Sequence, residues 1–192
     1  MHKVKRIRII VILFAVIAFM AAYIFMFCSV NAAFPQNKRV IYSFGETFTA
    51  QGAEFKITNA VLLSKSEIEK DKELTGILER NSGFSSVPDL NLALIDITAV
   101  NPGQEELDID LTSFHLESGA FSLQFYYPLV LYFNDGGMYI SLSKYEEKKL
   151  KMPVPVAGVH FLDYNYKKVK NRDYFLVYSL YPEKKMAAIK FS

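Results

Sequence analysis

The chain has 192 residues, of which 22 are Lys or Arg and 20 are Asp or Glu, giving a formal net charge of +2. Four of the basic residues and none of the acidic ones lie in the first 32 positions, so residues 33–192 carry 18 basic and 20 acidic side chains. The basicity belongs to the N-terminus, and no nucleic-acid partner is expected. The single cysteine, Cys28, excludes a disulfide framework.

The N-terminus has the pattern of a membrane segment. Lys3, Lys5, Arg6 and Arg8 precede an almost unbroken apolar run over residues 9–28. As a helix rising about 1.5 Å per residue, this run spans roughly 30 Å, the thickness of the hydrocarbon core of a bilayer. Residues 1–32 are therefore predicted to be a membrane anchor or signal peptide, with the membrane as partner through residues 9–28.

Two fates of this segment stay open. An apolar run longer than the roughly 7–15 residues of a signal peptide favours a retained anchor, whereas Val30, Asn31 and Ala32 before Ala33 allow cleavage near Ala32. In both cases the positive-inside rule places the remaining chain outside the cytoplasm. The expected location is the cell membrane, single-pass with an extracytoplasmic C-terminal domain. The alternative is secretion after cleavage.

Residues 33–43 are polar and are predicted to be a short tether. Strands are expected over residues 44–49 and 54–61, joined by a turn at Gln51 and Gly52. Residues 64–88 hold nine charged side chains around a few apolar ones and are interpreted as an insertion between strands, with a short helix at 66–80.

The middle of the chain holds the clearest strands. Residues 90–100 are apolar at almost every position, which predicts a central strand covered on both sides. After a turn at residues 101–104, Leu107, Ile109 and Leu111 alternate with polar residues, which indicates a strand with one solvent-exposed face.

The later part follows the same alternation. Apolar and polar side chains alternate over residues 121–127 and predict a strand that ends at Pro128. The apolar run 129–133 precedes a turn at 134–137 and a further extended segment at 138–142. Pro153 and Pro155 at alternate positions of residues 150–157 indicate an edge strand, because proline donates no ladder hydrogen bond. Residues 174–181 and 186–191 should close the chain as a hairpin.

Eight to ten short strands and only one expected helix predict an all-β fold. We expect an immunoglobulin-like β-sandwich over residues 44–192, preceded by one N-terminal transmembrane or signal helix.

The order of these segments resembles the telokin-like, immunoglobulin-like domain family of unknown function in surface lipoproteins and membrane-anchored proteins of Gram-positive bacteria. The matching segments are residues 44–48, 55–60, 94–105 and 108–116. Residues 143–148 lack the Pro-Gly-Glu turn of that family, and Phe27 before Cys28 does not fit a lipid-attachment site. The resemblance implies a fold and a surface location, with no shared catalytic residues.

No catalytic, cofactor-binding or metal-binding set is expected. His115 and His160 have no partner at triad or metal spacing. Asp108 and Asp110 are interpreted as the solvent-exposed face of a strand and not as calcium ligands, because no calcium-loop pattern surrounds them. An enzyme is therefore not expected.

One candidate partner-binding patch stands out. Tyr126 falls on the strand parity opposite to Phe125 and Tyr127, next to the predicted turn that contains Asn134 and Asp135. Exposed tyrosines gather at binding surfaces because they combine an apolar face with a hydroxyl. Tyr126, Asn134 and Asp135 are therefore the candidate site.

These observations predict a non-enzymatic extracytoplasmic interaction module displayed at the bacterial cell surface. Its ligand is unknown and is expected to be a protein or an envelope component. The alternative is an accessory or sensory subunit of a membrane complex, coupled through its N-terminal helix.

Overall fold

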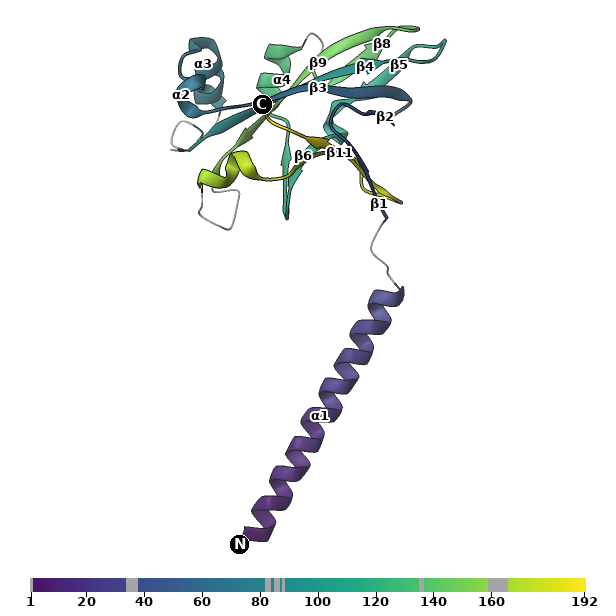
Figure 1. The fold of residues 1–192 in the computed structure, drawn as a ribbon, viewed down its shortest axis with the longest axis vertical. Helices are drawn as coiled ribbons and strands as arrows, with labels where there is room; N and C mark the ends of the chain where they lie inside the picture. The colour runs from purple at the N-terminus through teal and green to yellow at the C-terminus, as the bar shows by residue number, and fades with distance from the viewer. Residues whose placement is uncertain are drawn as a thin grey trace. The chain divides into compact units, whose positions relative to one another are not determined.

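The computed structural model describes residues 2–33, 38–81, 84, 87, 89–134, 137–158 and 166–192. The chain forms two compact units, residues Met1–Asn37 and Lys38–Ser192. The first unit holds one helix, and the second holds all the described strands (Figure 1).

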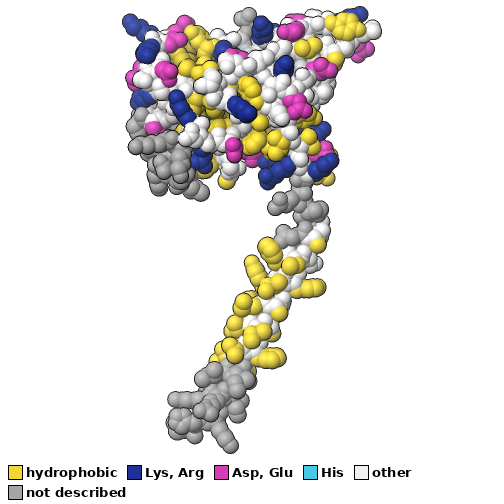
Figure 2. Space-filling view, in the orientation of Figure 1, with side chains coloured by type: hydrophobic (Ala, Val, Ile, Leu, Met, Phe, Trp, Pro, Cys, Tyr) yellow, Lys and Arg dark blue, Asp and Glu magenta, His cyan; other side chains and the backbone are white. Residues whose placement is uncertain are grey.

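Helix α1 (His2–Ala33) is the N-terminal helix that the apolar run predicts. Its segment Val11–Val30 has a mean hydropathy of 2.7 and is long and apolar enough to cross a membrane. Large apolar side chains are exposed along this segment, as in a helix whose natural surroundings are apolar (Figure 2).

The second unit is a β-sandwich, as predicted. One sheet has five strands in the order β1 (Arg39–Tyr42), β11 (Lys184–Ile189), β10 (Tyr174–Ser179), β6 (His115–Ser118) and β7 (Phe121–Gln124). The other has four, in the order β2 (Thr47–Ala50), β3 (Ala53–Leu63), β4 (Asn91–Val100) and β9 (Glu147–Val156). A two-stranded sheet pairs β5 (Leu107–Asp110) with β8 (Tyr139–Leu142). Two 3₁₀ helices, η2 (Leu111–Ser113) and η4 (Tyr166–Asn171), lie in the connections.

The main core lies between the two large sheets and follows the alternation of their strands. In β3, Ala53, Phe55 and Ile57 point inward, and a register shift between Ile57 and Asn59 then brings Ala60 to the inner face. Phe48 stacks on Phe55 with ring centroids 5.7 Å apart. Burial of these large apolar side chains supplies the main stabilisation of a domain without a disulfide.

Two predictions about strand position are confirmed. Strand β4 lies inside its sheet between β3 and β9, and β9, which carries Pro153 and Pro155, is an edge strand. The expected C-terminal hairpin is the antiparallel pair of β10 and β11.

A second apolar cluster covers part of the outer face of the four-stranded sheet. Helices α2 (Lys65–Ile68), α3 (Lys72–Asn81) and α4 (Tyr127–Phe133) contribute to it. Ile68, Leu74 and Leu129 pack there with Leu92 of β4. The first half of β4 is therefore covered on both faces, which explains its continuous apolar sequence.

The predicted insertion helix is two helices rather than one. Ser64 and Glu67 form a capping box at the start of α2, and the Asp71 carboxylate accepts hydrogen bonds from the backbone N–H groups of Glu73 and Leu74 at the start of α3. These side-chain acceptors end one helix and start the next within a few residues.

Residues 129–133 belong to helix α4 and are not extended, which corrects the prediction. Pro128 lies in the first turn of this helix, where the missing N–H costs nothing and the fixed φ suits a helix. Proline thus starts a helix here and does not merely limit a strand.

Part of the predicted tether, residues 33–43, is a strand. Residues 39–42 form β1, which pairs in parallel with β11. Val40, Ile41 and Tyr42 favour a strand, and the edge of β11 supplies the partner that local sequence does not reveal.

Candidate functional site

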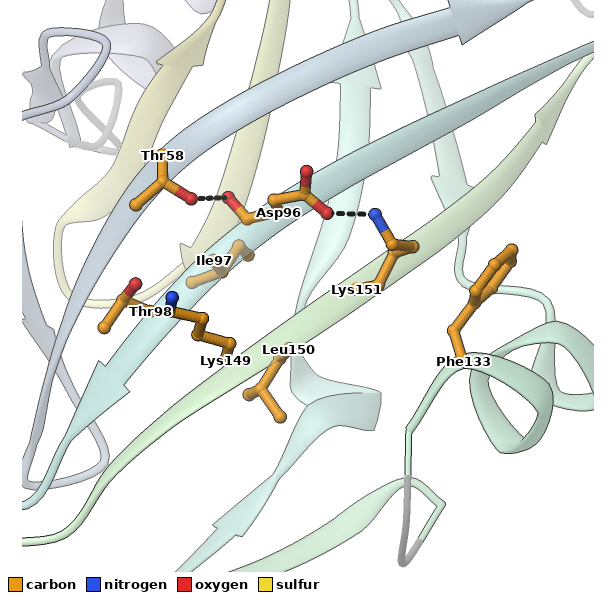
Figure 3. A pocket seen from close by; sticks show the side chains of 8 residues that line it. All are labelled: Thr58, Asp96, Ile97, Thr98, Phe133, Lys149, Leu150 and Lys151. Atoms are coloured by element: carbon orange, nitrogen blue, oxygen red, sulfur yellow. Dashed lines mark hydrogen bonds and ion pairs between the residues drawn. The ribbon is translucent and has the colours of Figure 1, made fainter.

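The candidate site is the part of the outer face of the four-stranded sheet that the helices leave open. Helices cover the first half of β4, whereas Asp96 and Thr98 in its second half are only half-buried. A hollow of about 350 Å³ lies over this part of β3, β4 and β9 (Figure 3). Its lining residues are Thr58, Asp96, Ile97, Thr98, Phe133, Lys149, Leu150 and Lys151.

Strand register brings the polar lining residues together. Asp96 lies opposite Lys151, and Thr98 lies opposite Lys149, in the antiparallel pair of β4 and β9. Because side chains alternate across a sheet, all four share the outer face while Ile97 and Leu150 point into the core. The register shift in β3 leaves Thr58 exposed beside them.

Asp96 is the centre of a polar network in this hollow. Its Oδ1 forms an ion pair with Lys151 Nζ, and its Oδ2 accepts a 3.0 Å hydrogen bond from Asn59 Nδ2. The Thr58 hydroxyl donates to the Asp96 backbone carbonyl at 3.2 Å. With both carboxylate oxygens bonded, Asp96 is a fixed structural anion that orients Lys151.

Other groups in the hollow are available to a ligand. The Lys149 ammonium and the Thr98 hydroxyl have no hydrogen-bond partner among the residues that the structure describes, and Figure 3 shows the two side chains side by side. Phe133 from α4 stands at the other end, with its ring centroid 5.9 Å from Lys151 Nζ. The hollow thus offers hydrogen-bond donors, a cation and an aromatic ring, which suit a ligand rich in oxygen acceptors.

The hollow continues along the same sheet face. A neighbouring depression of about 320 Å³ shares Thr58 and Thr98 and adds Glu54, Lys56 and Glu147 to the lining. Together the two form what we call the sheet groove, which has charges of both signs.

The described residues of the predicted patch do not form one exposed surface, and neither of them lines the groove. Tyr126 is half-buried and packs edge-to-face on Phe84, with centroids 5.4 Å apart. Asn134 is 7% exposed, and Asp135 lies outside the described residues. Tyr126 immediately precedes α4 and is not part of a strand, so the alternation that predicted its exposure does not apply. The binding role of these residues stays a prediction.

Asn134 has a structural role that the sequence does not reveal. Its Oδ1 accepts from the Lys151 backbone N–H at 2.8 Å, and its Nδ2 donates to the Lys151 carbonyl at 2.7 Å and to the Val130 carbonyl at 3.0 Å. The side chain therefore replaces a neighbouring strand at the edge of β9 and fixes the end of α4 there. This contact also positions Phe133.

The remaining sequence candidates lie apart from the groove. His115 is half-buried on β6, where desolvation lowers the pKa of its imidazole, with Glu117 opposing this effect; His160 lies outside the described residues. Asp110 accepts from Thr112 N at 2.8 Å and so caps η2. Within the described part of the chain no group of three or more His, Cys, Asp or Glu side chains could hold a metal.

Sequence reasoning missed the groove residues, although a local signal exists. Lys149 and Lys151 alternate with buried Leu150 and Met152, which marks one polar face of a strand. The pairing of Lys151 with Asp96 joins positions 55 residues apart, and it depends on sheet register.

Comparisons with known proteins concern the fold. No protein-family model matches the chain, and no curated protein matches it. Solved structures do match, including ycdA of Bacillus subtilis, a candidate lipoprotein, with a TM-score of 0.48 and 14% identity over 75% of this chain and 38% of that one. A functionally unknown protein of Listeria monocytogenes matches with a TM-score of 0.48 and 8% identity, over 77% and 82%. An uncharacterised β-sandwich protein of Clostridium difficile 630 matches with 0.40 and 12%, over 81% and 95%.

The chain thus spans 38% of the length of ycdA. The three TM-scores lie below 0.5 and the identities at or below 14%, so these likenesses carry no statement about the role of this chain. The resemblance to the telokin-like family stays a prediction.

Proposed function

We propose that this chain is a non-enzymatic extracytoplasmic interaction module, held at the bacterial membrane by α1, that binds a protein or envelope component. The observation that carries the proposal is the sheet groove. It is an open polar area on the outer face of a sheet that helices cover only in part.

The N-terminus supports the membrane part of the proposal. The segment Val11–Val30 suits a membrane span, and the basic residues lie only on its N-terminal side within the first 32 positions. The positive-inside rule then leaves the β-sandwich outside. The resemblance to surface-displayed telokin-like domains points the same way.

The groove chemistry supports a binding role. Lys149 and Thr98 present donors from neighbouring strands, and the Asp96–Lys151 pair holds a further cation in place. A rigid sheet positions such groups more precisely than a loop does. We expect the ligand to place oxygen acceptors against Lys149 and Thr98 and an apolar part against Phe133.

The test is site-specific photocrosslinking with the full chain in bacterial membranes. Thr98→p-benzoylphenylalanine places the probe in the groove, and Ser122→p-benzoylphenylalanine places it on β7 of the five-stranded sheet, where Ser122 is exposed. We expect a discrete adduct from position 98 only, weakened by Lys149→Ala. No adduct from position 98, or the same adducts from both positions, would contradict the proposal.

A second experiment distinguishes this proposal from the alternative, a subunit of a membrane complex that is coupled through its N-terminal helix. Residues 1–32 are replaced by an unrelated anchor, which leaves the sheet groove intact. We expect the position-98 adduct to persist. Its loss would favour an accessory or sensory subunit of a membrane complex.

A further inference from the structure

The turn between β10 and β11 carries an exposed apolar tip. Tyr181 is 81% exposed and Leu180 is 56% exposed. The turn is held in shape by the Ser179 hydroxyl, which donates to the Glu183 carbonyl at 3.2 Å and to the Tyr181 carbonyl at 3.4 Å. Two large apolar side chains are thus exposed to solvent on this turn, and neither belongs to the main hydrophobic core.

The start of β1 lies directly beside this turn. Arg39 pairs with Lys184 in the parallel ladder, and the Lys184 N–H donates to the Lys38 carbonyl at 2.8 Å. Ile41, on the same face of β1 as Arg39, is 55% exposed and extends the apolar surface. We call the set Lys38, Arg39, Ile41, Leu180, Tyr181 and Lys185 the basal tip.

The basal tip has an excess of positive charge. Lys38 pairs with Glu183 at 3.4 Å, and Lys184 pairs with Glu117 at 2.6 Å, so these two cations are partly compensated. Exposed Arg39 and half-buried Lys185 have no ion-pair partner among the residues that the structure describes. Figure 2 shows Lys and Arg side chains together with apolar ones at this end of the β-sandwich.

The basal tip also lies at the point where the β-sandwich joins the membrane segment in the chain. Helix α1 ends at Ala33, and five residues at about 3.5 Å each allow at most about 18 Å between Ala33 and Lys38. Of all the surfaces of the β-sandwich, the one around Lys38 has the shortest covalent connection to α1. The tyrosine, apolar side chains and cations of the basal tip match the composition of the bilayer interface.

We propose that the basal tip docks on the anionic surface of the bilayer in which α1 is anchored. Leu180 and Tyr181 enter the headgroup region, and Arg39 and Lys185 face lipid phosphates. The proposal rests on the retention of α1 in the membrane, which belongs to the proposed function. Docking would limit the rotation of the β-sandwich on its short connection.

The absence of tryptophan from the sequence allows a direct test. Tyr181→Trp introduces a single tryptophan at the basal tip, and Tyr139→Trp introduces one on β8, where Tyr139 is 69% exposed. Strand β8 lies at the opposite end of the β-sandwich from the start of β1 (Figure 1). Each full-length variant is reconstituted into vesicles of phosphatidylcholine with or without phosphatidylglycerol, using brominated acyl chains as quenchers.

We expect the fluorescence of the Tyr181→Trp variant to shift to shorter wavelength and to be quenched about twofold in vesicles containing phosphatidylglycerol, and less in phosphatidylcholine alone. The tryptophan of the Tyr139→Trp variant should stay solvated in both lipids. Identical spectra from the two variants would overturn the proposal, and equal quenching of the Tyr181→Trp variant in both lipids would overturn the anionic surface as the partner. Vesicle flotation of the same samples tests the anchor separately, since a Tyr181→Trp chain that floats with a solvated tryptophan retains α1 but does not dock.

Discussion

At the scale of single residues, two buried asparagines organise the connections around the sheet groove. Asn101 donates from Nδ2 to the carbonyls of Glu105, Leu142 and Ser143 and accepts from the Gly103 N–H at 2.9 Å. Asn134 bonds both backbone groups of Lys151 in the same manner. An amide side chain is suited to this role because it offers a donor and an acceptor together, as a peptide group does.

Replacement of Asn134 separates a structural role from the predicted role in partner binding. Asn134→Ala leaves the half-buried Lys151 N–H and carbonyl without their partner, which should lower the free energy of unfolding by about 2 kcal/mol. Urea denaturation followed by circular dichroism measures this change. Asn59→Ala is the control, because Asn59 is exposed and its loss should cost less than about 0.5 kcal/mol. Equal, small effects of both variants would refute the structural role.

At the scale of elements, the short helices decide which part of the outer face of the four-stranded sheet stays open. Helices of four and ten residues are not stable alone, so α2 and α3 depend on caps and on packing against the sheet. They cover Leu92 and leave Asp96 open, although both side chains lie on the outer face of the same strand, β4. The site is thus defined as much by where the covering helices end as by the strands beneath it.

The cap of α3 can be tested with a matched pair of variants. Asp71→Ala removes the acceptor for the Glu73 and Leu74 N–H groups and should lower the free energy of unfolding by about 1 kcal/mol. Asp71→Asn keeps a side-chain oxygen at the same position and should stay within about 0.3 kcal/mol of the parent. Thermal and urea unfolding check both values. An equal loss for Asn and for Ala would show that charge, and not capping, stabilises α3.

At the scale of the whole molecule, an apolar helix and a β-sandwich share one chain. The helix is fully exposed over Val11–Val30, whereas the β-sandwich has its own core and buries its large apolar side chains between sheets. Because the β-sandwich has its own core, it does not need α1 for its packing, which is compatible with the anchor role that we propose for this helix. In our two proposals, distinct surfaces of the β-sandwich serve distinct partners, the sheet groove a ligand and the basal tip lipid.

Retention of the anchor is a prediction about the whole chain. The apolar run exceeds the length of a signal-peptide core, so the mature protein should keep residues 1–32 and stay in the membrane fraction after alkaline extraction. N-terminal sequencing of the protein from the membrane fraction is the measurement. A mature chain beginning at Ala33 would show cleavage and release.

Features that depend on local pattern could be predicted from the amino-acid sequence. Hydrophobic length predicts α1, and alternation with turn signals predicts the β-sandwich, the central β4 and the edge strand β9, because burial on one or two faces imposes a period along the chain. The pairing of β1 with β11, the helical state of residues 127–133 and the meeting of Asp96 with Lys151 became visible only in the folded chain. These features depend on contacts between distant segments, whose register and partners have no local signature.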